Sequence, residues 1–381
     1  MTPQPKTGVI YRDDNLDRLR KLDAECVDLI YLDPPFFSNR HYEIIWGDES
    51  EIRSFKDRWK GGIDHYIGWM KPRLEELHRV LKPEGSIYLH CDYHASHRLR
   101  VLMDEIFGPR NFCNEIIWHY RKWSTGRRQF QRNHDVLLFY SRSPSKDRTF
   151  NDLYMERAAS TVKRFGKSKI ISGHDQEGRR VPSQTADEAS VGVRMDDVWD
   201  IGRVPPIKQL FPTQKPEPLL ERIMRASTNK GDLVLDPFCG CGTTLVVAHR
   251  LQRDWIGIDI SPTAIDVMQE RLSKIGAAAE IVNGISTVDD LRTLEPFEFQ
   301  NFIIKRVYGT HNPKRPELGI DGFSFMEKLP IEVKQQDHVG RPVVDRFETA
   351  IRRYGSHKGY IIAFNFTSGA YAEAARIRAE G

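Results

Sequence analysis

The sequence is poor in cysteine, and its cysteines are not spaced for a structural role. The five cysteines, Cys26, Cys91, Cys113, Cys239 and Cys241, include no CxxC pair and form no even framework. Disulfide stapling needs an even set, and a structural zinc site needs paired spacings. The sequence therefore argues against both kinds of site and indicates reduced thiols.

Long apolar runs and targeting segments are also missing. No apolar run approaches the ~18 residues that a membrane-spanning helix requires. The first ten residues hold one lysine and no apolar core segment, unlike a secretory signal or an organelle transit peptide. We therefore expect a cytoplasmic protein with no membrane partner.

Charge of one sign is not in large excess. The 57 Lys and Arg residues against 53 Asp and Glu residues give a formal charge of +4, which is too small to indicate a nucleic-acid partner by itself. The 381 residues are 39% hydrophobic and 29% charged, with a mean hydropathy of -0.53, as in folded globular proteins. This length suggests about two domains.

Short apolar runs alternate with helical patterns along much of the chain. Strands are predicted at 27–33, 85–92, 115–118, 135–140, 233–236 and 255–259, and helices at 63–81, 217–226 and 243–251. This alternation predicts a doubly wound α/β fold of the Rossmann-like type. Residues 141–206 lose the periodicity and gain Ser, Arg, Lys, Gly and Asp, which favours an inserted loop-rich module over further sheet.

The first chemical motif is DPFCGCGTT, which runs from Asp236 to Thr244. Gly240 and Gly242 lie between a predicted strand and a helix, where missing side chains let the backbone approach a ligand. Asp259 follows Asp236 by 23 positions (259 - 236), near the offset at which a carboxylate accepts ribose hydroxyls. A nucleoside cradle is predicted, and glycines that serve only a tight turn are the alternative.

The second motif is DPPF, formed by Asp33, Pro34, Pro35 and Phe36 at the end of a predicted strand. Asp33 and the Pro34 carbonyl can accept hydrogen bonds from one exocyclic amine, while Phe36 stacks on the base that carries it. These acceptors localise the nitrogen lone pair and make the amine a usable nucleophile. The alternative is a proline pair that only ends the strand.

A third motif, Thr213-Gln214-Lys215-Pro216, precedes a predicted helix. Together the motifs resemble the DNA amino-methyltransferases that use S-adenosylmethionine, in the β-class order with the catalytic motif first, over roughly residues 8–275. The resemblance implies that the DPPF residues bind and activate the target amine. It also implies a set of residues around the cofactor: Thr213, Gln214, Lys215, Asp236, Pro237, Phe238, Cys239, Gly240, Gly242, Thr243, Thr244 and Asp259.

The choice of base is a further expectation. A cytosine C5-methyltransferase would need a Pro-Cys nucleophile, and no cysteine follows a proline here. Aspartate before Pro-Pro resembles the adenine enzymes more often, so we favour adenine N6, with cytosine N4 as the alternative. RNA or protein-glutamine methylation, and a DNA-binding or nuclease protein with an inactive methylase domain, are the rival interpretations.

The resemblance implies double-stranded DNA as partner, because the target amine is reached by flipping its base. A basic segment without acids supplies the candidate contacts: Arg121, Lys122, Trp123, Arg127, Arg128 and Arg132. A solvated loop is the alternative. In the β-class pattern, residues 141–206 would recognise the target sequence. Family members often pair, so a homodimer is expected.

The C-terminal residues predict a second, smaller α/β domain. Helices are predicted at 298–308, 342–354 and 370–379, and strands at 319–325, 329–335 and 359–365. We place the methyltransferase domain at 1–290 and the second domain at 296–381.

Asp321, Glu332 and Lys334 of the second domain resemble the PD-(D/E)xK nuclease core, closest to Mrr-type restriction-endonuclease-like domains. The resemblance implies that the two carboxylates hold Mg2+ and that the lysine orients water. Gln336 continues the same strand face, and Glu298 is a further candidate from a helix. An inactive nuclease fold kept for DNA binding and a plain accessory domain are the alternatives.

Overall fold

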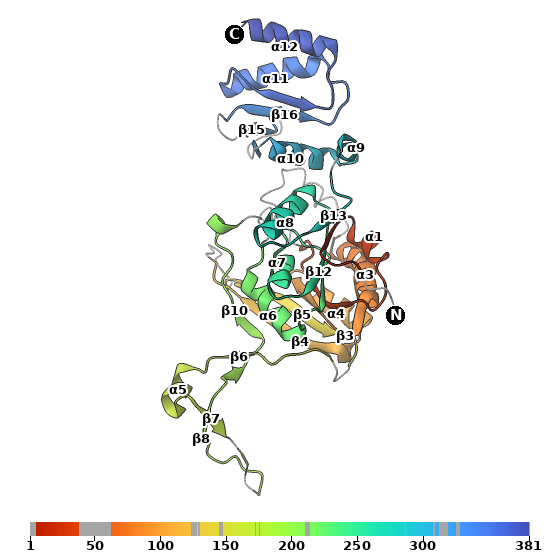
Figure 1. Cartoon of the computed structure of the whole chain (residues 1–381). Coiled ribbons are helices and arrows are strands. Elements are labelled where there is room, and N and C mark those ends of the chain that lie inside the picture. The colour runs from red at the N-terminus through yellow and green to blue at the C-terminus, as the bar shows by residue number, and fades with distance from the viewer. Residues whose placement is uncertain are drawn as a thin grey trace.

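The structure is a computed structural model with a large main unit, a projecting inserted segment and a second unit (Figure 1). It describes residues 5–37, 62–122, 128, 130–144, 148–171, 173–174, 176–209, 214–285, 287–307, 309–311, 319–324 and 328–380. In this part of the chain, no helix combines the length and the apolar character that crossing a membrane requires.

The main unit contains a nine-stranded sheet in the order β10-β4-β5-β3-β2-β11-β12-β1-β13. Its strands are β1 (Val9–Arg12), β2 (Val27–Leu32), β3 (Leu81–Cys91), β4 (Phe112–His119), β5 (His134–Ser141), β10 (Val198–Asp200), β11 (Leu233–Asp236), β12 (Asp254–Asp259) and β13 (Glu280–Val282). All neighbours are parallel except that β5 runs antiparallel to both β3 and β4. The predicted α/β fold with a mostly parallel sheet is confirmed.

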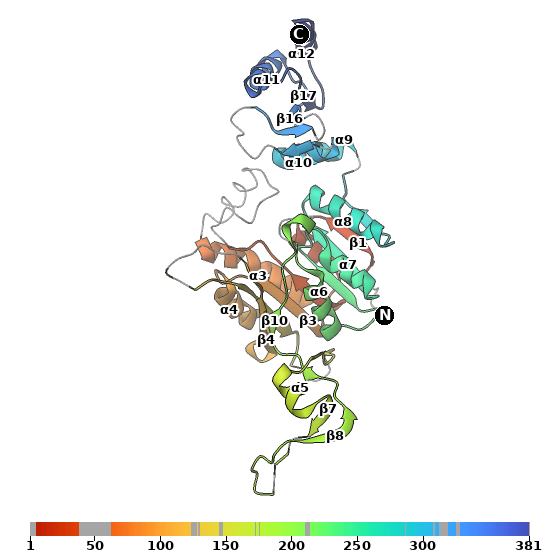
Figure 2. The same ribbon diagram turned by 90° about the vertical axis from the view of Figure 1, so that its left-hand side faces the viewer.

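Helices cover both faces of this sheet (Figure 2). Core residues of α6 (Glu217–Ser227), α7 (Thr243–Arg250) and α8 (Pro262–Lys274) pack with those of one face, and α1 (Asn15–Leu19), α3 (Gly62–Val80) and α4 (Ser96–Phe107) with the other. A 3-10 turn, η1 (Pro109–Asn111), follows α4. In β2, Leu29 and Tyr31 join the first core and Ile30 and Leu32 the second. Burial on both faces explains why the sequence of β2 is almost continuously apolar.

The strands β2 and β11 mark the point where the chain winds in opposite directions. From β2 the chain passes through α3 to β3 on one side, and from β11 it passes through α7 to β12 on the other. In open α/β sheets such a point leaves a crevice at the carboxyl ends of the two strands. The DPPF motif follows β2 and the DPFCGCGTT motif follows β11, so both begin at this crevice.

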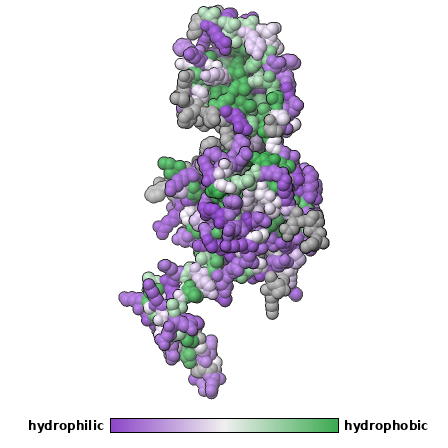
Figure 3. Space-filling model, viewed as in Figure 1, coloured by the Kyte–Doolittle hydropathy of each residue, from purple (hydrophilic) through white to green (hydrophobic). Residues whose placement is uncertain are grey.

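The inserted segment projects from the main unit, and its visible face is largely hydrophilic (Figures 1 and 3). It contains β6 (Tyr154–Met155), α5 (Ala159–Phe165), β7 (Ser168–Ile171), β8 (Gln184–Ala189) and β9 (Val193–Arg194), paired as β6-β9 and β7-β8. Within the predicted loop-rich range, β10 instead pairs with β4 in the main sheet, so the prediction is wrong there. Trp199 is buried in this strand, which is too short to show a period. The turn η2 (Pro206–Lys208) follows.

The second unit is a four-stranded sheet in the order β14-β15-β16-β17. Its elements are α10 (Pro296–Arg306), β14 (Gly309–His311), β15 (Gly322–Ser324), β16 (Pro330–Lys334), α11 (Arg341–Tyr354), β17 (Tyr360–Ala363) and α12 (Ser368–Glu380), preceded by α9 (Val288–Arg292). The β14-β15 and β15-β16 pairs are antiparallel, and β16-β17 is parallel. The predicted helices and strands are present, and β14 is an addition to them.

Candidate active site

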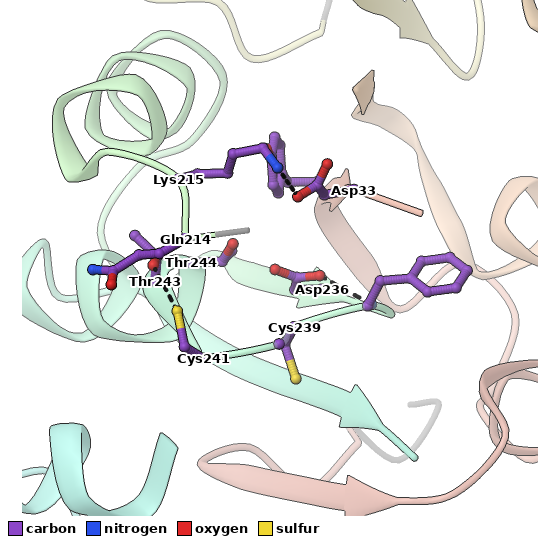
Figure 4. Close-up of a pocket in the computed structure, with 11 residues that line it drawn as sticks. Asp33, Gln214, Lys215, Asp236, Cys239, Cys241, Thr243 and Thr244 are labelled. Carbon is purple, nitrogen blue, oxygen red and sulfur yellow. Dashed lines mark hydrogen bonds and ion pairs between the residues drawn. The ribbon is translucent and has the colours of Figure 1, made fainter. Parts of the chain in front are cut away.

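One pocket at the crevice brings the three sequence motifs together (Figure 4). It is lined by Tyr31, Asp33, Gln214, Lys215, Asp236, Phe238, Cys239, Gly240, Cys241, Thr243 and Thr244. These residues come from the end of β2, the segment before α6 and the turn between β11 and α7. Thr213 lies outside the described residues. The arrangement suits a ligand that contacts all three segments at once.

The glycine turn is shaped by its backbone and by close packing. Gly242 caps α7 in the left-handed region at φ 72°, and a Cβ there would approach Met268 Cγ to 2.5 Å. The turn itself therefore requires this glycine. The Gly240 N–H donates to Asp259 Oδ2 at 2.7 Å, and the Ser261 N–H donates to Asp259 Oδ1 at 2.9 Å. Asp259 thus holds the glycine turn, a contact that the sequence interpretation did not include.

Two carboxyl groups beneath the turn have raised pKa values. Burial raises the pKa of Asp236 to about 7, although hydrogen bonds from Thr244 and from the Phe238 N–H oppose the shift. Burial likewise raises the pKa of Asp259 to about 6. Near neutral pH, Asp236 is therefore about half protonated, whereas Asp259 is mostly ionised. A cationic ligand would therefore be bound with release of protons.

Asp33 lies between two basic side chains. The Lys215 ammonium is paired with Asp33 Oδ2 and lies over the Phe36 ring, 5.3 Å from its centroid. Asp33 Oδ1 lies 3.3 Å from His90 Nδ1. Lys215, expected at the cofactor, thus also contacts the residue expected to activate the amine.

Sequence reasoning missed His90, although it lies in a predicted strand. The side chain has no exposed surface and lies one residue before the end of β3, beside Asp33. A signal was present, since His90 directly follows the apolar run from Ile87 to Leu89 next to the crevice. The same reasoning missed Asp135, whose Oδ2 lies 3.5 Å from His90 Nε2.

Arg271 on α8 joins the glycine turn to the helix that follows Lys215. Its Nη1 donates to the Cys241 carbonyl oxygen at 2.7 Å and to Thr243 Oγ1 at 3.1 Å, and its Nη2 donates to Glu217 Oε1 at 3.3 Å. The arginine is only 9% exposed. Charge-assisted hydrogen bonds from a buried guanidinium are strong and directional. Arg271 thereby fixes two walls of the pocket relative to each other.

The basic segment begins at the end of β4, which runs in the same direction as β2 and β3. It therefore begins at the same edge of the sheet as the pocket. Arg121 and Arg128 are exposed, Lys122 lies 5.6 Å from the Tyr120 ring centroid, and Arg132 donates to the Tyr93 hydroxyl at 2.9 Å. Trp123 and Arg127 lie outside the described residues.

The nuclease-like residues are close together in the second unit. Asp321 Oδ2 accepts from the Val333 N–H at 2.6 Å, and the Lys334 ammonium lies 2.8 Å from Glu332 Oε1. Burial raises the pKa of Glu332, with Lys334 opposing and Asp321 adding to the shift. The helix candidate Glu298 adds to the raised pKa of Asp259. Within the described ranges, no group of three or more His, Cys, Asp or Glu side chains could hold a metal ion.

A comparison with protein families matches residues 27–270 to the N6/N4 methylase model, described as DNA methylase. The chain belongs to the DNA methylase family. The type II methyltransferase M.HpaI of Haemophilus parainfluenzae is 29% identical over 76% of this chain and 80% of its own. The DNA adenine methyltransferase YhdJ of Escherichia coli K12 is 31% identical over 69% of this chain and 82% of its own. The solved PvuII DNA methyltransferase (cytosine-N4-specific) is 15% identical with a TM-score of 0.45, covering 74% of this chain and 97% of its own.

This DNA methylase is therefore a site-specific DNA methyltransferase that uses S-adenosylmethionine, as the resemblance in its motifs implied. Its family match spans the main sheet from β2 to α8 and thus all three pocket motifs. The pocket fits the methyl donor, because its lining combines the backbone turn at Gly240 with the buried carboxyl of Asp236. DNA is the macromolecular partner that family membership gives.

Proposed function

We propose that this enzyme methylates the N6 amine of adenine in double-stranded DNA. The observation that carries the proposal is the placement of Asp33, the acid of DPPF, in the same pocket as the glycine turn. The choice of adenine is supported by the aspartate before Pro34 and by the similarity to a relative named as a DNA adenine methyltransferase.

Asp33 and the Pro34 carbonyl would accept the two protons of the flipped amine, and Phe36 would stack on the base. Asp236, Asp259, Gln214 and the turn from Phe238 to Thr244 would hold the methyl donor, which supplies an electrophilic methyl group on sulfonium. Lys215 would hold the Asp33 carboxylate in place while it accepts. Positioning of amine and donor in line would supply most of the rate enhancement.

The test is incubation of the full chain with labelled S-adenosylmethionine and mixed-sequence duplex DNA, followed by nucleoside mass spectrometry. We expect N6-methyladenine, and we expect Asp33→Ala to abolish it while cofactor affinity changes little. Label only in N4-methylcytosine would refute the choice of base. Full turnover by Asp33→Ala would refute the role of the acid.

A second candidate function is Mg2+-dependent DNA cleavage by the restriction-endonuclease-like unit, residues 296–381. The observation in its favour is Glu332 Oε2, which is buried without a hydrogen-bond partner among the described residues, in a side chain that is 4% exposed. Asp321 and Glu332 would hold Mg2+ through their oxygens, and Lys334 would orient water. We expect Mg2+-dependent cutting of unmethylated DNA that Lys334→Ala stops. Cutting that persists in Lys334→Ala would refute this site.

The proposal extends to how DNA is held. The basic residues from Arg121 to Arg132 would contact phosphates beside the pocket, and residues 141–206 would read the target sequence. We also propose a methyltransferase domain at 1–290, a homodimer and a cytoplasmic location. Light scattering of the purified enzyme with and without duplex DNA would test the dimer, and a monomer under both conditions would contradict it.

A further inference from the structure

The buried histidine His90 lies between two carboxylates, and the three residues belong to three neighbouring strands or their ends. Leu32 of β2 pairs with Leu89 of β3, and Cys91 of β3 pairs with Val136 of β5. Asp33, His90 and Asp135 therefore lie side by side at the crevice edge of the sheet. His90 Nδ1 is 3.3 Å from Asp33 Oδ1, and His90 Nε2 is 3.5 Å from Asp135 Oδ2.

The environment of His90 is unusual for a histidine that only fills space. The ring has no exposed surface and meets Phe36 and Trp118 edge to face, with centroids 5.3 and 5.5 Å away. Its Nε2 and Asp33 Oδ1 are both buried, and their contacts with Asp135 Oδ2 and His90 Nδ1 are longer than ordinary hydrogen bonds. Buried polar atoms normally have hydrogen-bond partners, so two that are held only by long contacts, on opposite sides of one imidazole ring, need an explanation.

The other groups facing His90 define how a proton could travel. The Tyr31 hydroxyl on β2 lies 3.1 Å from Nδ1. Lys215 occupies Asp33 Oδ2 and leaves Oδ1 for His90. Burial acts to raise the pKa of Asp135, but the hydrogen bond and charge of His90, with Lys215 and Tyr120, hold it below its ordinary value. The Asp33 and Asp135 side chains are 15% and 16% exposed, so Asp135 gives a proton a second way to water, away from the pocket.

We propose that Asp33, His90 and Asp135 form a relay that removes the proton released by methyl transfer. As the nitrogen–carbon bond forms, the carbon–sulfur bond breaks and its electron pair stays on sulfur. The nitrogen becomes cationic and loses one of its two protons to Asp33. That proton passes to His90 Nδ1, while the Nε2 proton passes to Asp135 and then to water. The relay rests on the proposed attack by an exocyclic amine, and it serves adenine and cytosine amines equally.

In this relay His90 is a positioning residue, because it touches Asp33 and not the amine. A positioned proton acceptor contributes about 10²- to 10⁴-fold to rate. Asp33, His90 and Asp135 can take up the proton from the amine only if they do not already carry an extra proton. The rate of methyl transfer should therefore fall on acidification, and the acid limb should depend on His90.

The test is single-turnover methyl transfer to duplex DNA from about pH 5.5 to about pH 8.5, with His90→Asn, Asp135→Asn and the double variant. We expect each single variant to lose about 100-fold in rate with unchanged cofactor affinity. His90→Asn should also lose the acid limb, and the double variant should be no slower than the slower single variant. His78→Asn is the matched control, since His78 is a partly buried histidine that packs edge-on against Phe107 on another helix.

A His90→Asn rate within about threefold of wild type would overturn the relay. His90 would have a structural role instead if His90→Asn were slower but kept the wild-type fall in rate at low pH. The same would follow if the rate losses of the two single variants added up in the double variant. If His90→Asn does not fold, the rate and pH dependence of Asp135→Asn will test the relay by the same criteria. The Asp135 side chain reaches solvent, so we expect this variant to fold. Failure of the wild-type enzyme to methylate any base would refute the proposed function, and it would be visible before the variants are compared.

Discussion

Acidification should weaken S-adenosylmethionine binding through Asp236. This carboxyl is 2% exposed, lines the pocket and has a pKa of about 7. The methyl donor carries a sulfonium and an ammonium, so the ionised carboxylate should bind it and the neutral acid should not. With a pKa of about 7, the ionised fraction falls about 30-fold between about pH 8.5 and about pH 5.5. The dissociation constant should rise by a similar factor.

Calorimetric titration at several pH values measures this dependence. Near pH 6.5 we expect binding to release up to about one proton, which buffers of different ionisation enthalpy will reveal. S-adenosylhomocysteine is the control ligand, because it lacks the sulfonium charge and should show a shallower dependence. Asp236→Asn should bind more weakly at high pH and lose most of the pH dependence. An unchanged slope in Asp236→Asn would refute the assignment to this carboxyl.

The same pKa has the opposite effect on the stability of the free enzyme. A carboxyl whose pKa is raised in the folded state keeps its proton there after the unfolded chain has lost its own. The free enzyme should therefore lose stability as the pH rises from about 4 to about 7, by on the order of 4 kcal/mol if Asp236 acts alone. Asp236→Asn should remove this loss in urea unfolding. Acidification should thus weaken cofactor binding and stabilise the enzyme that has no cofactor bound.

Two further predictions concern residues that support the pocket. Arg271→Ala should lower the free energy of unfolding by about 1–3 kcal/mol in urea titrations, because it leaves the Cys241 carbonyl oxygen in the glycine turn without its buried donor. An unchanged free energy of unfolding would contradict this. Lys215→Met should reduce the single-turnover rate of methyl transfer more than it reduces cofactor affinity, because the ammonium is paired with Asp33. If Lys215→Met changes only the affinity for the cofactor, Lys215 binds the cofactor and does not act through Asp33.

The sequence was informative where the chemistry is local. The DPPF and DPFCGCGTT motifs each place their residues within one turn, so spacing alone indicates what the backbone brings together. Apolar runs likewise predicted β2, β11 and the helix α6 after Pro216. Element ends moved by a few residues, as for β3, which begins at Leu81.

The contacts around Asp33 could not be predicted in this way. His90 and Asp135 reach it only through the pairing of β3 with β2 and β5, and no local pattern encodes that register. The short strand β1 at Val9–Arg12 was missed for a related reason, since four residues show no period. Trp199 is the third case, because its burial depends on the neighbouring strand β4.

The order of the motifs in the chain has little bearing on how the pocket works. Parallel neighbours in a sheet end at the same edge whichever is made first, so β2 and β11 can meet although about two hundred residues separate them. What the pocket requires is that the helices following these strands diverge, which leaves room between their turns. Gln214 and Lys215 then enter from the segment before α6, and Arg271 ties that helix to the glycine turn. The catalytic acid and the glycine turn therefore face each other because of sheet pairing, and a β-class order of motifs is one of several that the same sheet could carry.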